Sequence, residues 1–273
     1  MIKCNDWPIS VCTWSLDNDF DKINALREQT GISCLNLALL PALERGGESY
    51  ISRIKTENWQ IPCTMINFPQ EDYSTLDSIK VTGGIVPEKF WDANRQMVLD
   101  AIDLTVQLKV KYLLFHFGFI EDTDSEASRK FREKVLFLAD AAGDKNVMLL
   151  METGQETAEH LKTFVETLNH PSIGINFDPA NMILYDKGNP IQAVKTLSPW
   201  IKHIHIKDAL RTKAAGTWGQ EVVWDTGEVG SEEFLRTLKR INYTGALAIE
   251  REAGDSRLED IKTASEALRC FAG

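Results

Sequence analysis

The stretch Ile201-Lys-His-Ile-His-Ile-Lys-Asp208 is the segment that decides the fold class. Its isoleucines alternate with polar residues at a period of two, which is typical of a β-strand. A strand that is buried on both faces tolerates polar side chains only where they find partners. The histidines at positions 203 and 205 therefore predict polar groups, above all carboxylates, at matching places on other strands.

Apolar segments recur along the chain and alternate with amphipathic helical patterns. The predicted strands are residues 9–15, 33–39, 61–68, 112–118, 147–153, 173–179, 201–208 and 245–252. The predicted helices are residues 16–29, 43–59, 88–109, 125–142, 157–168, 191–197, 231–241 and 258–271. Eight strand–helix repeats in 273 residues predict an α/β protein, a single-domain (β/α)₈ TIM barrel that spans residues 1–273.

A doubly wound open sheet is the alternative fold. Such sheets usually carry a glycine-rich phosphate-binding turn after their first strand. Residues 15–20 read SLDNDF and contain no glycine, which favours the barrel. Two long connections remain in either case: residues 69–87 form a lid or a surface excursion, and residues 209–230 form a loop rich in glycine and tryptophan.

Charge and composition exclude several partners. The chain has 40 acidic and 30 basic residues, and its net charge of -10 argues against binding to nucleic acid or to an anionic membrane surface. No apolar run reaches eighteen residues and the start does not resemble a signal peptide, so we expect a cytoplasmic protein. The five cysteines lack C-x-x-C spacing and predict core thiols rather than disulfides or a thiolate zinc site.

Four side chains that can bind a metal ion fall at the C-terminal ends of consecutive predicted strands. They are Glu152, Asp178, His205 and Glu250, separated by 26, 27 and 45 residues. Because barrel active sites are built at this end of the strands, we expect the four side chains to converge. The alternative is that each is a rim residue with its own salt bridge.

Three carboxylates around one space repel each other unless a cation neutralises them. Oxygen-rich ligation with one nitrogen makes Mn²⁺ our first expectation, with Mg²⁺, Co²⁺ and Zn²⁺ as alternatives. Such an ion would stabilise the enediolate that forms when a proton is removed next to a carbonyl. Return of the proton on the other face or the adjacent carbon gives epimerisation or isomerisation, and loss of a β-hydroxyl gives dehydration.

Four motifs carry a resemblance to a known family: METG at 151–154, NFDPAN at 176–181, HIHIKD at 203–208 and GALAIEREAG at 245–254. The chain resembles the xylose isomerase-like TIM barrels, in the sugar phosphate isomerase/epimerase branch that includes ketose 3-epimerases, hydroxypyruvate isomerase and inosose dehydratase. The resemblance implies one divalent metal ion bound by Glu152, Asp178, His205 and Glu250. It also implies that Glu152 and Glu250 are the catalytic acid/base pair, and that a homo-oligomer is to be expected.

The resemblance further implies a substrate contact at Arg211, six residues after the histidine ligand. Two positions depart from the ketose 3-epimerases. Asn181 stands where those enzymes carry a substrate-binding histidine, and Ala158 stands where they carry a second glutamate. Because those residues hold sugar hydroxyls, we do not carry the ketohexose specificity over.

Four more polar or aromatic residues lie at predicted strand ends and are candidate substrate contacts: His116, Lys207, Asn67 and Trp14. His116 either binds a substrate oxygen or is a buried histidine satisfied by the backbone. Lys207 either neutralises an anionic substrate or pairs with a loop carboxylate. Asn67 and Trp14 either line the pocket, where an aromatic ring suits the C–H face of a sugar, or serve as core and capping residues.

The remaining histidines and Arg251 are expected to have structural roles. His203 shares a strand face with His205 but lies deeper, where it would support the site indirectly. Arg251 points away from Glu250 by strand alternation. His160 and His170 lie on or after a predicted helix and are expected at the surface.

The leading hypothesis is a divalent-metal-dependent isomerase or epimerase of a small sugar or sugar derivative. An inosose-type dehydratase on the same site and a non-catalytic sugar-binding barrel are the alternatives. An apurinic-site endonuclease would need three zinc ions, and five histidines with a net charge of -10 argue against it.

Overall fold

Eight parallel strands form a closed ring in the computed structural model, which describes residues 1–44, 47–121 and 125–271. They are β2 (Trp7–Cys12), β3 (Cys34–Ala38), β4 (Gln60–Met65), β5 (Tyr112–Phe115), β6 (Met148–Glu152), β7 (Ile173–Phe177), β8 (Ile201–Ile206) and β11 (Leu247–Ile249). Each pairs in parallel with its neighbours, and the pairings of β2 with β3 and with β11 close the ring. The predicted (β/α)₈ barrel is confirmed, and an open sheet is excluded.

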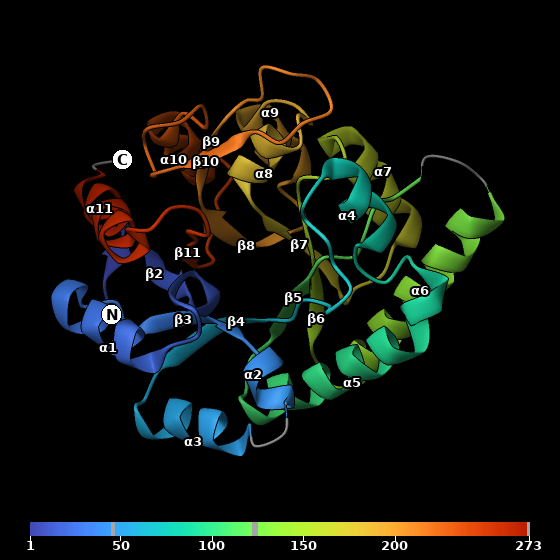
Figure 1. The fold of residues 1–273 in the computed structure, drawn as a ribbon, viewed down its shortest axis with the longest axis horizontal. Coiled ribbons are helices and arrows are strands. Elements are labelled where there is room, and N and C mark those ends of the chain that lie inside the picture. The colour runs from blue at the N-terminus through green and yellow to red at the C-terminus, as the bar shows by residue number, and fades with distance from the viewer. Residues whose placement is uncertain (45–46, 122–124, 272–273) are drawn as a thin grey trace.

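Helices surround this ring of strands (Figure 1). They are α1 (Phe20–Thr30), α3 (Glu48–Thr56), α5 (Trp91–Gln107), α6 (Glu126–Gly143), α7 (Ala158–Leu168), α9 (Pro190–Leu197), α10 (Ser231–Arg240) and α11 (Arg257–Cys270). The last helix, α11, packs beside α1 and so completes the outer layer. Among the described residues, no helix has the length and apolar character needed to cross a membrane.

The first helix begins later than the sequence pattern predicts. Residues Thr13–Leu16 form a short 3₁₀ turn, and Asp17 and Asn18 adopt positive φ angles of 59° and 56°. The side chain of Asp19 then accepts the backbone N–H groups of residues 21 and 22 and caps α1. This turn places Trp14 at the C-terminal end of the barrel.

Short helices and a hairpin lie in the connections that follow the C-terminal ends of the strands (Figure 1). They are α2 (Leu40–Leu43), α4 (Leu76–Thr82), η2 (Glu88–Phe90), α8 (Pro179–Leu184), and the hairpin of β9 (Asp208–Leu210) with β10 (Gln220–Val222). The long segment 69–87 contains α4, which begins at a capping box between Thr75 and Ser78. At the opposite end of the barrel, β1 (Lys3–Cys4) pairs antiparallel with β2.

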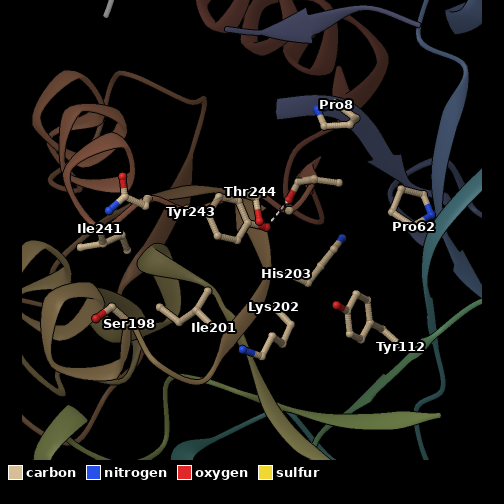
Figure 2. Close-up of a pocket in the computed structure, with 13 residues that line it drawn as sticks. Pro8, Pro62, Tyr112, Ser198, Ile201, Lys202, His203, Ile241, Tyr243 and Thr244 are labelled. Carbon is tan, nitrogen blue, oxygen red and sulfur yellow. Dashed lines mark hydrogen bonds between the residues drawn. The ribbon is translucent and has the colours of Figure 1, made fainter. Parts of the chain in front are cut away.

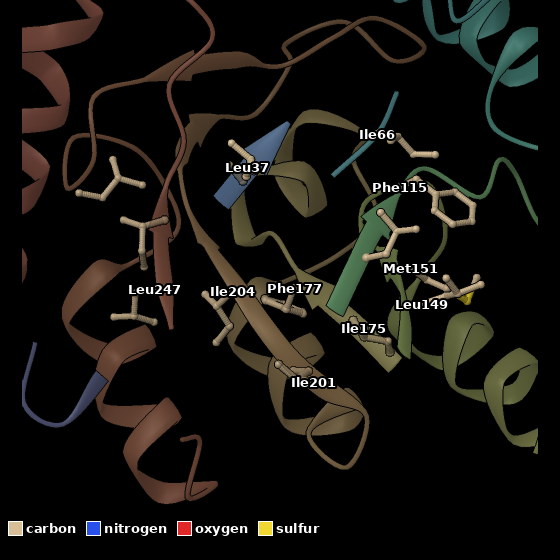
Figure 3. Close-up of a cluster of buried hydrophobic side chains, with 14 of the residues drawn as sticks. Leu37, Ile66, Phe115, Leu149, Met151, Ile175, Phe177, Ile201, Ile204 and Leu247 are labelled. Atoms are coloured by element: carbon tan, nitrogen blue, oxygen red, sulfur yellow. The ribbon is translucent and has the colours of Figure 1, made fainter. Parts of the chain in front are cut away.

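The main hydrophobic core lies between the strands and the surrounding helices. Figure 3 shows outward-facing side chains of this core, among them Ile204 of β8, Phe177 of β7 and Met151 of β6. The barrel interior holds a smaller apolar cluster of Cys63, Leu114 and Leu150. All five cysteines are free thiols. Because alternate residues of a strand face opposite sides, burying Ile204 and Ile206 of β8 against the helices turns its histidines into the barrel.

Candidate metal centre

The four predicted ligands meet at the C-terminal end of the barrel. Glu152 ends β6, Asp178 follows β7, His205 lies in β8 and Glu250 follows β11, and their ligand atoms lie within 4.8 Å of one another. Nδ1 of His205 lies 3.1 Å from Oε1 of Glu152, 3.2 Å from Oε2 of Glu250 and 4.0 Å from Oδ2 of Asp178. We call these residues the four-residue cluster.

Two atoms of the cluster lack the hydrogen bonds that burial demands. Oδ2 of Asp178 and Nδ1 of His205 have no hydrogen-bond partner in the described part of the chain. The other carboxylate oxygen of Asp178 accepts the backbone N–H groups of Ala180 and Asn181 at 2.8 and 3.1 Å, which turns Oδ2 toward the cluster. Orphaned oxygen and nitrogen donors around a common space fit a divalent cation.

The orientation of His205 is fixed by an amide behind it. Nε2 of His205 lies 3.0 Å from Oδ1 of Asn36, whose amide nitrogen donates to the carbonyl of Cys63 at 3.2 Å. Because the amide oxygen accepts, Nε2 carries the proton and Nδ1 keeps the lone pair that a metal ion needs.

Protons partly balance the charge in the cluster. Burial raises the pKa of Asp178 to about 8, and the nearby Glu250 adds to this effect. Burial also works against the charge on Glu250, but the neighbouring Lys207 and His205 hold the pKa of that carboxyl below its usual range. A cation that binds here would displace protons, so its affinity should depend on pH.

Cys12 lies close enough to His205 and Glu250 to be considered as a further ligand. Burial raises the pKa of its thiol to about 12. Because Mn²⁺ and Mg²⁺ prefer oxygen and imidazole ligands to thiolates, the carboxylate and imidazole set describes the site better.

A cavity of about 770 Å³ opens above the cluster. Four of the predicted substrate contacts line it, namely Trp14, Asn67, His116 and Lys207. Trp14 also donates from Nε1 to Oε1 of Glu250 at 2.7 Å. The fifth predicted contact, Arg211, is not among the lining residues, because its guanidinium binds Asp186 and lies 3.9 Å from Oε2 of Glu228. Its substrate role stays a prediction.

Lys207 lies among carboxylates. Its ammonium nitrogen is 2.8 Å from Oε2 of Glu252, 3.1 Å from Oε2 of Glu250 and 3.8 Å from Oδ2 of Asp178. Pairing with a loop carboxylate, one of the two predicted roles, is therefore present in the structure. Burial opposes the charge on Lys207, but these carboxylates raise its pKa well above the usual value.

His203 and Arg251 have the structural partners that the sequence suggests for them. Nδ1 of His203 lies 2.8 Å from Oδ1 of Asn176 inside the barrel. Arg251 binds Glu221 and Asp260 at 2.6 and 2.9 Å. Because Glu221 lines the cavity, this ion pair also fixes part of the cavity wall.

The sequence analysis does not identify several residues that lie at the site. Glu71 contacts His116, Asn36 contacts His205, and the aromatic rings of Tyr73, Tyr185 and Trp218 line the cavity. Glycines 216 and 219 and the two tryptophans flag the loop 209–230 in the sequence, but no motif marks Asn36 or Glu71.

A second cavity of about 460 Å³ lies at the N-terminal end of the strands (Figure 2). Lys202, His203 and Tyr112 line it, and Tyr243 donates its hydroxyl to the carbonyl of Ala246 at 2.7 Å. Active sites of this fold occupy the C-terminal end, whereas the N-terminal end serves stability. The functional assignment therefore goes to the larger cavity.

Comparison with known proteins gives a family and several relatives. A family model described as xylose isomerase-like TIM barrel matches residues 38–272. A xylose isomerase domain protein from Planctomyces limnophilus superposes with a TM-score of 0.88 and 30% sequence identity over 96% of each chain. A xylose isomerase-like TIM barrel protein from Mycobacterium smegmatis, in complex with magnesium, has a TM-score of 0.73 and 17% identity, with 100% of each chain covered.

Two further relatives have named activities. D-allulose 3-epimerase from a Methylomonas species, in complex with D-allulose, has a TM-score of 0.66 and 16% identity over 98% of this chain and 95% of that chain. At such identity the likeness shows the fold alone. An inosose dehydratase from Clostridium botulinum is 26% identical over an alignment of 138 positions that covers 44% of this chain and 45% of that protein. The chain thus matches less than half the length of this curated relative.

Proposed function

The chain belongs to the xylose isomerase-like TIM barrel family, and we propose that it is a divalent-metal-dependent isomerase or epimerase of a sugar or sugar derivative. The observation that carries the proposal is the four-residue cluster, in which buried donor atoms of Asp178 and His205 lack partners in the described chain. Glu152, Asp178, His205 and Glu250 would hold the ion. Mn²⁺ remains our first expectation and Mg²⁺ the first alternative.

Glu152 and Glu250 are the proposed acid/base pair. The two carboxylates come from β6 and β11, with β7 and β8 between them in the ring, so they approach a substrate from different sides. A bound divalent cation supplies charge stabilisation next to the substrate carbonyl. One glutamate takes a proton from the carbon beside that carbonyl, and the other returns a proton.

Other residues orient this pair and surround the substrate. Trp14 and Lys207 hold the two carboxylate oxygens of Glu250 at 2.7 and 3.1 Å. Aromatic rings in the cavity wall, including Tyr73 and Trp218, suit the C–H faces of a sugar.

Dehydration is the second candidate function, and the match to an inosose dehydratase is the observation that favours it. Asn181 and Ala158 point the same way, because they stand where ketose 3-epimerases carry substrate contacts. Dehydration begins with the same proton abstraction, so product mass distinguishes the two.

Deuterium incorporation tests the proposal. The protein is incubated in D₂O with Mg²⁺ or Mn²⁺ and a panel of ketoses, aldoses, keto-inositols and small hydroxy-ketones. Proton NMR follows the signal of the hydrogen on the carbon next to the carbonyl, directly in the Mg²⁺ samples and after metal removal in the Mn²⁺ samples. We expect metal-dependent exchange that Glu152→Gln abolishes and that Glu166→Gln, on the exposed face of α7, leaves intact. A protein that binds metal and sugar but exchanges nothing is a binding barrel, and the proposal fails.

A further inference from the structure

A second buried pair of ionisable side chains lies beside the cavity, outside the four-residue cluster. Nδ1 of His116 is 3.2 Å from Oε1 of Glu71, and the two side chains are 9% and 2% exposed. His116 follows β5, and β5 pairs with β6, the strand that ends in Glu152. The pair therefore flanks the proposed metal site on one side.

The carboxylate of Glu71 has a fixed orientation. Its Oε1 also accepts the backbone N–H of Gly84 at 3.0 Å, and its Oε2 accepts the backbone N–H of Phe68 at 3.0 Å. One donor lies immediately before the segment 69–87 and the other lies near its end. With His116 as the third partner, Glu71 ties that segment to the end of β5.

Glycines make room for this arrangement. A Cβ at position 83 would lie 2.9 Å from Cε1 of His116, and one at position 84 would lie 2.2 Å from the carbonyl carbon of Phe117. Gly84 also has a φ of +63°, which other residues rarely adopt. The imidazole is thus held by close packing as well as by Glu71.

The free nitrogen of His116 is the feature that needs an explanation. His116 lines the cavity and is 8% exposed, yet its Nε2 has no hydrogen-bond partner among residues 1–44, 47–121 and 125–271. The other ionisable groups near it are Tyr73, whose ring centroid lies 6.2 Å away, and the buried Glu156. Because Glu71 occupies Nδ1, Nε2 is the ring nitrogen left for a ligand in the cavity.

Epimerisation returns a proton to the same carbon on its other face and isomerisation returns it to the adjacent carbon, and Glu152 with Glu250 suffices for both. Loss of an oxygen instead needs an acid that reaches the departing hydroxyl, since hydroxide is a poor leaving group until it is protonated. A histidine backed by a carboxylate is the arrangement that enzymes use to carry a proton in such a step.

We infer that His116 is a catalytic general acid for loss of a β-hydroxyl, with Glu71 as its positioning residue, and that the substrate is a hydroxy-ketone that loses water. This inference rests on the proposed proton abstraction at the metal site, and it selects dehydration, the second candidate function, over isomerisation and epimerisation. A glutamate of the cluster takes the proton from the α-carbon, and those C–H electrons form the C=C bond. The β C–O bond breaks and its electrons go to the oxygen. The imidazolium form of His116, whose Nδ1–H donates to Glu71, gives its Nε2 proton to that oxygen, which leaves as water. Solvent then returns a proton to Nε2 and takes the one held by the glutamate.

The experiment measures two rates on the metal-loaded protein with a keto-inositol: deuterium entry at the α-carbon and formation of the unsaturated product. His116→Gln keeps a hydrogen-bonding group but cannot donate a proton as an acid. We expect its elimination rate to fall by about 100-fold or more, while deuterium entry changes by less than about threefold. Glu71→Gln should shift the ratio of exchange to elimination in the same direction.

His170→Gln is the matched control, because Nε2 of His170 also contacts a carboxylate, Asp140, at 3.1 Å on the outer layer. Both of its rates should equal those of the parent protein. Thermal melting and metal content show whether each variant is folded and loaded.

Each other outcome overturns the inference. Equal loss of both rates in His116→Gln would give the histidine a role in binding or proton abstraction. An unchanged elimination rate in His116→Gln would contradict the role of His116 as general acid. A parent protein that exchanges the α-proton without releasing water would contradict it as well. Both results are compatible with the proposed function. If the parent protein shows no deuterium exchange at the α-carbon, both proposals are contradicted.

A spectroscopic measurement adds a readout that does not depend on turnover. Long-range ¹H–¹⁵N spectra of the histidine rings report which nitrogen carries the proton. We expect a protonated Nδ1 on His116 that changes in Glu71→Gln, and a shift of Nε2 when the keto-inositol is added. An Nε2 resonance that does not shift when the keto-inositol is added contradicts the inference.

Discussion

At the residue scale, the proposed ligands depend on partners that lie behind them. His205 offers Nδ1 to the cluster because Asn36 accepts the proton on Nε2, and Asp178 offers Oδ2 because its other oxygen caps α8. Partners of this kind orient a ligand without touching the metal ion.

Replacing Asn36 tests this arrangement. Asn36→Leu has a similar volume but no acceptor for Nε2–H, so we expect the affinity for Mn²⁺ to fall by about 10- to 100-fold. Isothermal titration calorimetry measures the change. Asn176→Leu is the matched control, because Asn176 contacts His203 rather than a proposed ligand. Equal losses in both variants would indicate general destabilisation instead.

Glu156 provides a pH-dependent test of stability. Burial raises the pKa of this carboxyl from 4.5 to about 7, although the backbone N–H of Ile120 and the charge of His116 oppose the rise. Between these values the folded protein keeps the proton and the unfolded chain has lost it, so the group reduces stability as pH rises.

The neutral variant Glu156→Gln should escape this loss. Relative to the parent protein, its free energy of unfolding should increase by up to about 3 kcal/mol between pH 4 and pH 8, since one pKa unit corresponds to about 1.4 kcal/mol. Urea unfolding at several pH values measures the difference. Glu166→Gln, on an exposed position of α7, should show no such trend. If the difference in unfolding free energy between Glu156→Gln and the parent protein does not change with pH, the raised pKa of Glu156 is contradicted.

At the scale of elements, the connections after the strands build the cavity wall. The loop 209–230 carries Trp218 and Glu221 into the lining, and Asp208 organises that loop. Its carboxylate accepts the backbone N–H groups of residues 209, 225, 227 and 229 at 2.8 to 3.1 Å. A Cβ on Gly227 would come within 2.3 Å of this carboxylate.

Asp208→Asn should therefore loosen the loop. An amide NH₂ cannot accept the bonds that one carboxylate oxygen accepts, so we expect a destabilisation of about 2 kcal/mol. Faster proteolytic cleavage between residues 209 and 230 should accompany it. Asp186→Asn is the control, because Asp186 forms a largely exposed ion pair with Arg211 that contributes little. Resistance to protease equal to that of the parent protein would contradict the role of Asp208.

At the scale of the whole molecule, four consecutive barrel strands from the second half of the chain contribute to the four-residue cluster. A cation bound by β6, β7, β8 and β11 together favours the closed barrel over the unfolded chain. At a Mn²⁺ concentration 100 times Kd, the stabilisation should be about 2.7 kcal/mol, which raises Tm by roughly 5 °C.

Differential scanning calorimetry with and without Mn²⁺ measures this rise, and a chelator should reverse it. Glu250→Gln should show a much smaller rise, since it removes a ligand charge. If Mn²⁺, Mg²⁺, Co²⁺ and Zn²⁺ all leave Tm unchanged, the cluster does not hold a metal ion.

The sequence by itself determined the barrel and the place of the four-residue cluster. Strand–helix repeats leave few ways to bury their apolar faces, and the C-terminal ends of parallel strands necessarily share one end of the barrel. Residues at those ends, such as Glu152 and Glu250, could therefore be grouped from spacing and alternation alone.

The tertiary structure decided which partners these residues meet. Asn36 reaches His205 across 169 positions, Glu71 reaches His116 from within a long connection, and Arg211 turns toward Asp186. No local pattern encodes these contacts, because loop paths and side-chain rotamers follow from packing between segments that are distant in sequence.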